Sequence, residues 1–312
     1  MAATATGVYK TSYRKDLALR HTRAEYIRLA LIAVFLVAVP FFADSFWLNV
    51  LDQIGIAVIA AVGLNILTGY TGQVSLGTGG FLAAGAYTSA NVITRMDLPT
   101  PLGIVAAVAV SALVGAFFGL PALRLKGLYL AIATLASQEI IIYVVRSWKA
   151  VTGGVDALVV SPPTLGSFVL GGTGRVGDFR WYWVIMFFAV AAGFAGLAGA
   201  LVGSWRGIVT WERFTLEISI TYVAMVIIGG LGSISGSVYG AAFVIAVDSY
   251  LVRLGQQLQA RGTYEFITEN IPAIRIGMFG LIIVIFLIIE PRGLARLWQR
   301  VKDYFRLWPF RY

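Results

Sequence analysis

The stretch Gly69–Phe81, GYTGQVSLGTGGF, combines glycines with polar side chains between two long apolar runs. Asn65 precedes it, and Gln73 and Ser75 lie inside it. Inside a membrane, backbone that breaks a helix is tolerated only where protein or a water-lined cavity satisfies its hydrogen bonds. A polar break at this place therefore indicates either a path for a polar solute or a phosphate-binding loop.

The phosphate-binding interpretation fails at one pair of residues. Gly72 and Gly77 have the spacing of the Walker A loop, in which a lysine and then a serine or threonine reach the phosphates and the metal. Here Thr78 and Gly79 occupy those two positions. We therefore expect that this chain binds no ATP and no other cofactor.

A second glycine break, Gly229–Gly240, lies between apolar runs in the second half of the chain. Transporters place broken helices at corresponding positions of two halves, where helix ends and freed backbone groups line the substrate path. Close helix packing is the competing interpretation. The pairs with the small-xxx-small spacing of membrane helix interfaces are Gly115–Gly119, Gly199–Gly203, Gly232–Gly236 and Gly236–Gly240.

Two carboxylates lie within apolar runs. Charged side chains in membrane helices are costly and usually face protein or water. Glu139, next to Gln138, is a candidate either for the pathway or for a hydrogen bond between helices. Asp248 is expected near a helix end, where its carboxylate can reach the membrane interface.

The composition indicates a membrane protein. Hydrophobic residues make up 59% of the 312 residues and charged residues 12%, and the mean hydropathy is +0.83. A soluble domain carries about 25% charged residues. Cysteine is absent and the single histidine, His21, lies in a basic stretch, which disfavours thiolate, histidine and metal chemistry. We expect an all-α polytopic membrane protein of about eight to ten spans, with no metal site, that is not an enzyme.

Apolar runs long enough for a crossing, which takes about 20 residues, set the expected spans. They are residues 26–43, 47–67, 79–95, 101–121, 127–146, 181–203, 216–231, 237–253 and 274–290. Basic residues concentrate in 1–28 and 292–312, so the positive-inside rule places both termini in the cytoplasm. We expect a basic tail over 1–28, a transmembrane domain over 29–291, and a basic tail over 292–312.

The C-terminal tail has apolar residues near one helical face and basic residues opposite, which indicates either a helix along the membrane surface or a frayed tail. The expected spans contain a contradiction, because nine crossings cannot leave both termini on one side. Either one glycine-broken segment is re-entrant, or one crossing has been lost from the chain.

Several motifs, in order between residues 47 and 294, resemble the LivM-type permease of branched-chain amino acid ABC transporters. They are GYTGQVSLGTGGFLAAGAYTSA, LRLKGLYLAIATLASQEI, TGGVDAL, AGLAGAL, MVIIGGLGSISGSVYGAA and EPRGL. The resemblance implies a multi-pass permease of the plasma (inner) membrane that pairs with a second, LivH-like permease subunit. It also implies two cytoplasmic ATPase subunits that use ATP, and an extracytoplasmic amino-acid-binding protein that delivers leucine, isoleucine or valine.

On this resemblance the two glycine breaks line or shape the translocation path. The residues that it assigns to the path are Gly69, Gln73, Ser75, Gly77, Glu139, Gly229, Gly230 and Gly232, and Asn65 is added as a polar neighbour of the first break. Two alternatives stay open. One is an ABC permease for urea or short amides, which has similar motifs. The other is a secondary transporter or channel that needs no ATPase.

The chain departs from the family pattern at one place. Family members have a basic cytoplasmic segment, which docks on the ATPase, between the span near RWYWVIMFF and the AGLAGAL helix. Here Phe188 is followed directly by Ala189, and no arginine or lysine lies between Arg180 and Arg206. We expect that a coupling segment is missing near residue 188, that two spans are merged over Trp181–Gly203, and that the chain couples poorly to ATP hydrolysis.

Overall fold

The computed structural model describes two compact units, Met1–Asp44 and Ser45–Tyr312. In the first unit the described part is α2, Arg23–Phe42, with residues 43–44. The candidate site lies in the second unit. The described residues of the whole chain are 23–122, 124–154, 156–160, 164–165, 168–169, 177, 181–185, 195–260, 265–290 and 293–307.

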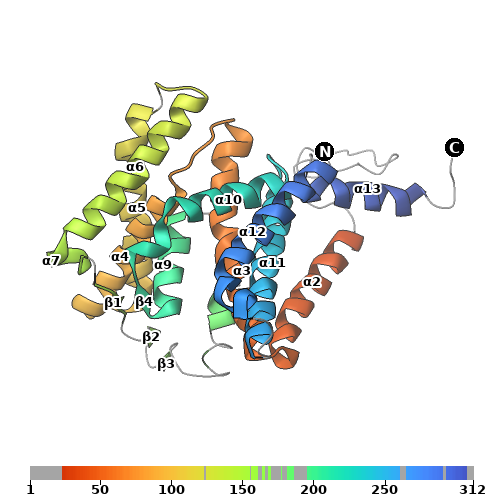
Figure 1. The fold of residues 1–312 in the computed structure, drawn as a ribbon, viewed down its shortest axis with the longest axis horizontal. Helices are drawn as coiled ribbons and strands as arrows, with labels where there is room; N and C mark the ends of the chain where they lie inside the picture. Colours follow the sequence, from red (N-terminus) through yellow and green to blue (C-terminus); the bar gives the residue numbers. More distant parts are fainter. Residues whose placement is uncertain are drawn as a thin grey trace. The chain divides into compact units, whose positions relative to one another are not determined.

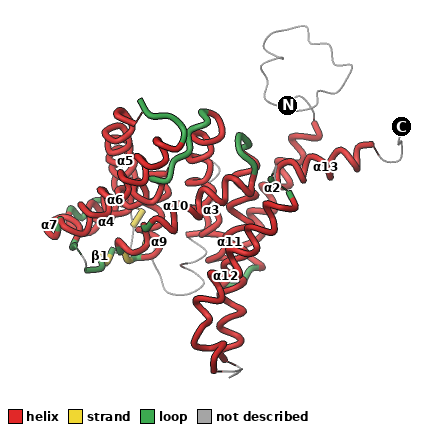
Figure 2. Tube along the Cα trace, turned by 45° about the horizontal axis from the view of Figure 1, so that its top comes forward, coloured by secondary structure: helices red, strands yellow, loops and turns green. Residues whose placement is uncertain are grey.

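Helices form nearly all of the described second unit (Figures 1 and 2). They are α3 (Ser45–Asn65), the π-helix η1 (Ile66–Tyr70), α4 (Thr78–Arg95), α5 (Thr100–Ala122), α6 (Leu128–Ser147), α7 (Lys149–Thr152), α9 (Ala195–Arg206), the 3₁₀-helix η2 (Trp211–Phe214), α10 (Leu216–Gly229), α11 (Ile234–Ala260), α12 (Glu265–Ile289) and α13 (Leu294–Leu307). The unit also contains two short antiparallel strand pairs. They are β1 (Leu158–Val159) with β4 (Ile208–Val209), and β2 (Thr164–Leu165) with β3 (Phe168–Val169).

α3 is the central helix of this unit. Its residues are apolar around most of the circumference, as in a helix surrounded by other helices within a membrane. Ile56, Ile59 and Leu64 are all buried, and α3 packs against α9, α10 and α11. Because α3 leads directly into η1, this buried helix fixes the start of the first glycine break.

α4 and α9 pack closely through glycine. A Cβ atom placed on Gly85 would lie 2.5 Å from the Gly196 carbonyl oxygen, and one on Gly199 would lie 2.2 Å from the Leu82 carbonyl oxygen. Distances this short leave no room for a side chain. The packing interpretation is therefore confirmed for Gly199. In α5, by contrast, no atom lies within 4 Å of a Cβ placed on Gly119.

α5 and α6 present large apolar side chains on the surface of the chain. Leu113 and Phe117 of α5 and Leu128 and Tyr143 of α6 are among the most exposed. Such surfaces on apolar helices are typical of sides that face lipid or another membrane subunit.

Four described helices are long and apolar enough to cross a membrane: Ser45–Tyr70, Thr100–Ala122, Leu128–Ser147 and Ile234–Leu258. The expected all-α polytopic membrane fold is confirmed. In the described part of the expected span 181–203, residues 181–185 are helical and α9 begins at Ala195. The junction of Phe188 with Ala189 lies outside the described residues.

α10 has 14 residues. At about 1.5 Å per residue it is about 21 Å long, which is shorter than the hydrocarbon core of about 30 Å. The length of α10 therefore favours a re-entrant segment over a full crossing at the expected span 216–231. A lost crossing near residue 188 stays a separate prediction.

The C-terminal tail contains the expected helix as α13, which follows α12 after a short connection (Figure 1). The rings of Tyr239 in α11 and Trp298 in α13 lie 6.3 Å apart between their centroids. The contacts divide the chain after Asp44, and the expected domain boundaries at residues 28 and 291 stay predictions.

Candidate functional site

The first break runs from the end of α3 to the start of α4. η1 widens the last helical turn, residues 71–77 are not helical, and Gly72 has a φ of +69°. Protein groups satisfy part of the freed backbone. The Gln73 N–H donates to the Leu67 carbonyl oxygen (3.4 Å), and the Leu76 N–H donates to Oγ1 of Thr134 in α6 (3.0 Å). The predicted helix break is therefore confirmed, and α6 supports it.

The second break, residues 230–233, is shorter and enclosed by backbone. A Cβ placed on Gly229 would lie 2.0 Å from the Gly236 carbonyl oxygen, so α10 and the start of α11 touch through their main chains. Gly230 packs in the same way against Gly293, with 2.6 Å between a Cβ placed on Gly293 and the Gly230 Cα. Glycine is required here because any side chain would separate these segments.

Asn65 joins the two breaks. Its Nδ2 donates to the Ser233 carbonyl oxygen (2.9 Å) and to the Ser237 Oγ (2.8 Å), and its Oδ1 accepts a hydrogen bond from the Gly232 N–H (2.9 Å). Asn65 is 1% exposed. A Cβ placed on Gly69 would lie 2.3 Å from the Gly232 nitrogen, so the two breaks also touch directly. One buried amide therefore links segments from the two halves of the chain.

The second break is linked in turn to α13. Glu290, 4% exposed at the end of α12, accepts a hydrogen bond from Arg300 Nη2 of α13 (2.9 Å between Oε1 and Nη2). Gly293, directly before α13, contacts Gly230. α13 is therefore connected, through Glu290 and Gly293, to the residues that contact the second break.

Of the other predicted site residues of the first break, Gly77 lies against α6. Gln73 is half-buried and Ser75 is buried, and the Gly77 N–H donates to the Ser75 Oγ (3.4 Å). A Cβ placed on Gly77 would lie 2.9 Å from the Thr134 carbonyl oxygen. The structure therefore brings Asn65, Gly69 and Gly232 into contact, places Gly229 and Gly230 beside Gly232 in the second break, and places Gly77 against α6.

Glu139 is not part of this cluster. It is exposed on α6, whereas its neighbour Gln138 is fully buried. Oε1 of Gln138 accepts a hydrogen bond from the Ser219 Oγ, and the Ser219 Oγ accepts one from the Gly79 N–H (2.7 Å). This polar contact between α4, α6 and α10 was missed, because the sequence does not show which of two adjacent polar residues faces inward. A pathway role for Glu139 stays a prediction.

The position of Asp248 differs from the expected one near a helix end. α11 continues to Ala260, so Asp248 lies in the middle of this helix and not near its end. The long helix places the carboxylate beside a cavity that Arg206 and Glu217 also line. Among the described residues, no group of three or more histidines, cysteines, aspartates or glutamates could hold a metal ion.

A family model described as "Branched-chain amino acid transport system / permease component" matches residues 46–171 and 177–289. These two segments contain both breaks and their links to one another. The chain belongs to this permease family. Membership places it among transport proteins of the membrane and makes it the membrane component of an ABC transporter.

Two curated relatives share its sequence. The high-affinity branched-chain amino acid transport system permease protein LivM of Escherichia coli K12 is 28% identical over 294 aligned positions, which cover 72% of this chain and 68% of the relative. The protein of the same name from Salmonella typhimurium LT2 is 28% identical over 292 positions, with the same shares covered. No solved structure matches the chain.

The alignment bears on the missing segment. Its 294 positions exceed 72% of the 312 residues of this chain, so the E. coli relative has residues without a counterpart here. The two parts of the family match are separated at residues 172–176. The alignment therefore supports an internal shortening, and its location at residue 188 stays a prediction.

Proposed function

We propose that the chain is the permease subunit through which an ABC importer moves branched-chain amino acids across the plasma membrane. The observation that carries the proposal is the family match over both glycine breaks, together with the Asn65 contact that unites them. Broken helices that meet within a bundle of apolar helices supply backbone groups to a polar path. Leucine, isoleucine and valine are the proposed substrates because both LivM relatives bear the name of branched-chain amino acid transport.

Transport in this proposal needs partners. A second, LivH-like permease would cover the exposed apolar sides of helices such as α5, and an extracytoplasmic binding protein would deliver the amino acid. Two cytoplasmic ATPases would bind and hydrolyse ATP, since this chain lacks the Walker A lysine. The basic residues at both ends place the termini in the cytoplasm under this proposal.

The test is uptake of radiolabelled leucine by cells without their own branched-chain amino acid importers. The cells express the chain with its partner permease, binding protein and ATPases, or with an ATPase that lacks its Walker A lysine. A second version of the chain contains the segment of the E. coli relative that lies between the corresponding spans, inserted between Phe188 and Ala189. We expect leucine uptake that requires the intact ATPase and that rises about tenfold or more with the inserted segment, as restored coupling predicts.

Each other outcome answers a separate question. If uptake is equal with and without the inserted segment, the chain does not need that segment for transport, and the proposed function stands. Uptake of urea or acetamide in place of leucine would establish the amide alternative. Leucine uptake that persists without an active ATPase would establish a secondary transporter or channel.

A further inference from the structure

A second site lies apart from the two breaks. A cavity of about 330 Å³ lies among α3, α4, α9, η2, α10, α11 and α12. Sites for small molecules usually measure about 300–1,000 Å³, so this cavity has the size for a small solute. None of the residues predicted for the pathway lines it.

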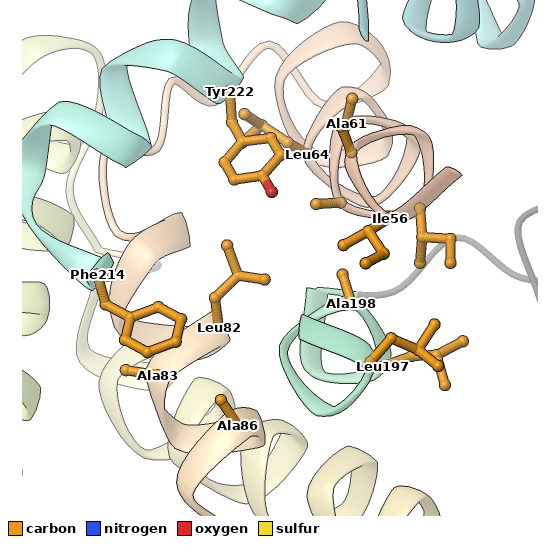
Figure 3. Close-up of a cluster of buried hydrophobic side chains, with 14 of the residues drawn as sticks. Ile56, Ala61, Leu64, Leu82, Ala83, Ala86, Leu197, Ala198, Phe214 and Tyr222 are labelled. Carbon is orange, nitrogen blue, oxygen red and sulfur yellow. The ribbon is translucent and has the colours of Figure 1, made fainter. Parts of the chain in front are cut away.

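The inner part of the cavity is apolar. Ile56, Leu82, Phe214 and Tyr222 line it, and Figure 3 shows these four side chains turned toward a common space. Val244 of α11 completes this part. The surface fits an aliphatic side chain, because it gives apolar contact from several helices at once.

The rim of the cavity carries both signs of charge. Arg206, Glu212, Arg213 and Glu217 line it, and all four side chains are exposed. They come from the end of α9, from η2 and from the first turn of α10. Within the described residues, Glu212, Arg213 and Glu217 form no ion pair or side-chain hydrogen bond. Partial loss of hydration and, second, the nearby Arg213 guanidinium lower the pKa of Arg206, which indicates that the two cations lie close together.

Tyr222 adds a polar group between the rim and the apolar part. It is 7% exposed, and its hydroxyl makes no hydrogen bond within the described part of the chain. Figure 3 shows the hydroxyl pointing into the space between Leu82 and the residues of α3. This hydroxyl can donate to or accept from a solute in the cavity.

We infer that this cavity binds the free amino acid, with its carboxylate between Arg206 and Arg213, its ammonium group facing Glu212 and Glu217, and its aliphatic side chain in the apolar part. The inference rests on the proposed function and names a substrate site in the permease itself. A rim with both charges suits a zwitterion, whereas urea and short amides carry no net charge on either end. An anion alone would gain nothing from the two glutamates.

The test uses the full chain in lipid nanodiscs without a binding protein. Saturation-transfer NMR measures the leucine methyl signals and therefore reports weak binding directly. Leucinamide lacks the carboxylate, and 4-methylpentanoate lacks the ammonium group. We expect each analogue to bind about tenfold or more weakly than leucine, because each loses one charge-assisted contact.

Substitutions assign the two contacts. Arg213→Gln should weaken the binding of leucine about tenfold and leave the binding of leucinamide unchanged, so that the chain no longer prefers leucine to leucinamide. Glu217→Gln should remove the preference for leucine over 4-methylpentanoate in the same way. Arg253→Gln on α11 and Asp97→Asn before α5 lie outside the cavity and serve as charge-matched controls that leave both preferences intact.

The outcomes separate this site from the proposed function. Equal binding of leucine and both analogues, or no leucine signal with the unaltered chain, would overturn the site even if the cells described above take up leucine. If Arg213→Gln does not fold, it will bind neither leucine nor leucinamide. The measurement on Glu217→Gln then tests the inference. Unchanged preferences in both Arg213→Gln and Glu217→Gln would also overturn the inference.

Discussion

The two glycine breaks use the same residue for different physical purposes. In the first break, Gly72 has a positive φ and no atom lies within 4 Å of a Cβ placed on it, while Tyr70 and Val74 are exposed. In the second break, Gly229 and Gly230 touch the main chain of other segments. Glycine gives conformational freedom at Gly72 and close approach at Gly229, and Gly69 of the first break also approaches the main chain of the second closely at Gly232.

Because of this difference, we expect the two breaks to differ in mobility. An open segment with few packed contacts changes conformation at little cost, whereas main-chain contacts between helices resist it. We expect the part of the first break around Gly72 to move during transport and the second break, with Asn65 and Gly69 against it, to act as the fixed support. Substitutions in each region can sharpen or contradict this comparison.

The largest effect is expected for Gly240→Ala in α11. A Cβ on Gly240 would lie 1.9 Å from the Met225 carbonyl oxygen, and main chain cannot move aside as a flexible side chain can. Overpacking costs about 1–3 kcal/mol and occasionally more. We expect a lower yield of folded protein and a clearly lower melting temperature in detergent.

The matched control for this variant is Gly119→Ala in α5. It makes the same change within a helix, at a position where no atom lies within 4 Å of the added Cβ. Alanine favours a helix over glycine by about 1 kcal/mol, so this variant should melt at the same temperature or slightly higher. If Gly240→Ala melts like Gly119→Ala, the close contact between α10 and α11 beside the second break does not stabilise the fold.

A smaller but still large effect is expected for Asn65→Ala. The change leaves the partly buried Gly232 N–H without a partner, whereas the Ser237 hydroxyl still donates to the Ser233 carbonyl oxygen (3.4 Å). An unsatisfied buried group costs about 1–3 kcal/mol. Hydrogen exchange by mass spectrometry should then show faster exchange at Gly232. Asn91→Ala is the control, since Asn91 Nδ2 donates, among the described residues, to the Tyr87 carbonyl oxygen of its own helix (2.8 Å). Equal exchange at Gly232 in both variants would contradict a link through Asn65.

The smallest effect is expected for Gly72→Ala. The position has open space, so the cost comes only from the positive φ and amounts to about 1–2 kcal/mol. Gly72→Asn should recover part of this loss in melting temperature, because asparagine tolerates the left-handed region. If the asparagine variant is the less stable of the two, a steric contact and not backbone conformation determines Gly72.

Much of this architecture could be predicted from the sequence. The expected spans 79–95 and 101–121 agree closely with α4 and α5, because apolar runs bounded by polar turns determine where a membrane helix begins and ends. Both breaks were expected for the same reason, since glycine and serine interrupt the runs. The expected span 216–231 also agrees with α10, but the continuation of α11 from residue 253 to Ala260 was not expected, because hydropathy alone does not measure the length of a helix that other helices support.

By itself, the sequence determined that this protein is a bundle of membrane helices with two glycine breaks, and its motifs determined the family. Tertiary structure decided that Asn65 joins the breaks, that Gln138 faces inward while Glu139 faces outward, and that Arg213 and Glu217 share a cavity with Tyr222. The reason is physical. Apolar patterning follows from local composition, whereas the rotation of each helix and the partners of each polar group depend on contacts between segments far apart in the chain.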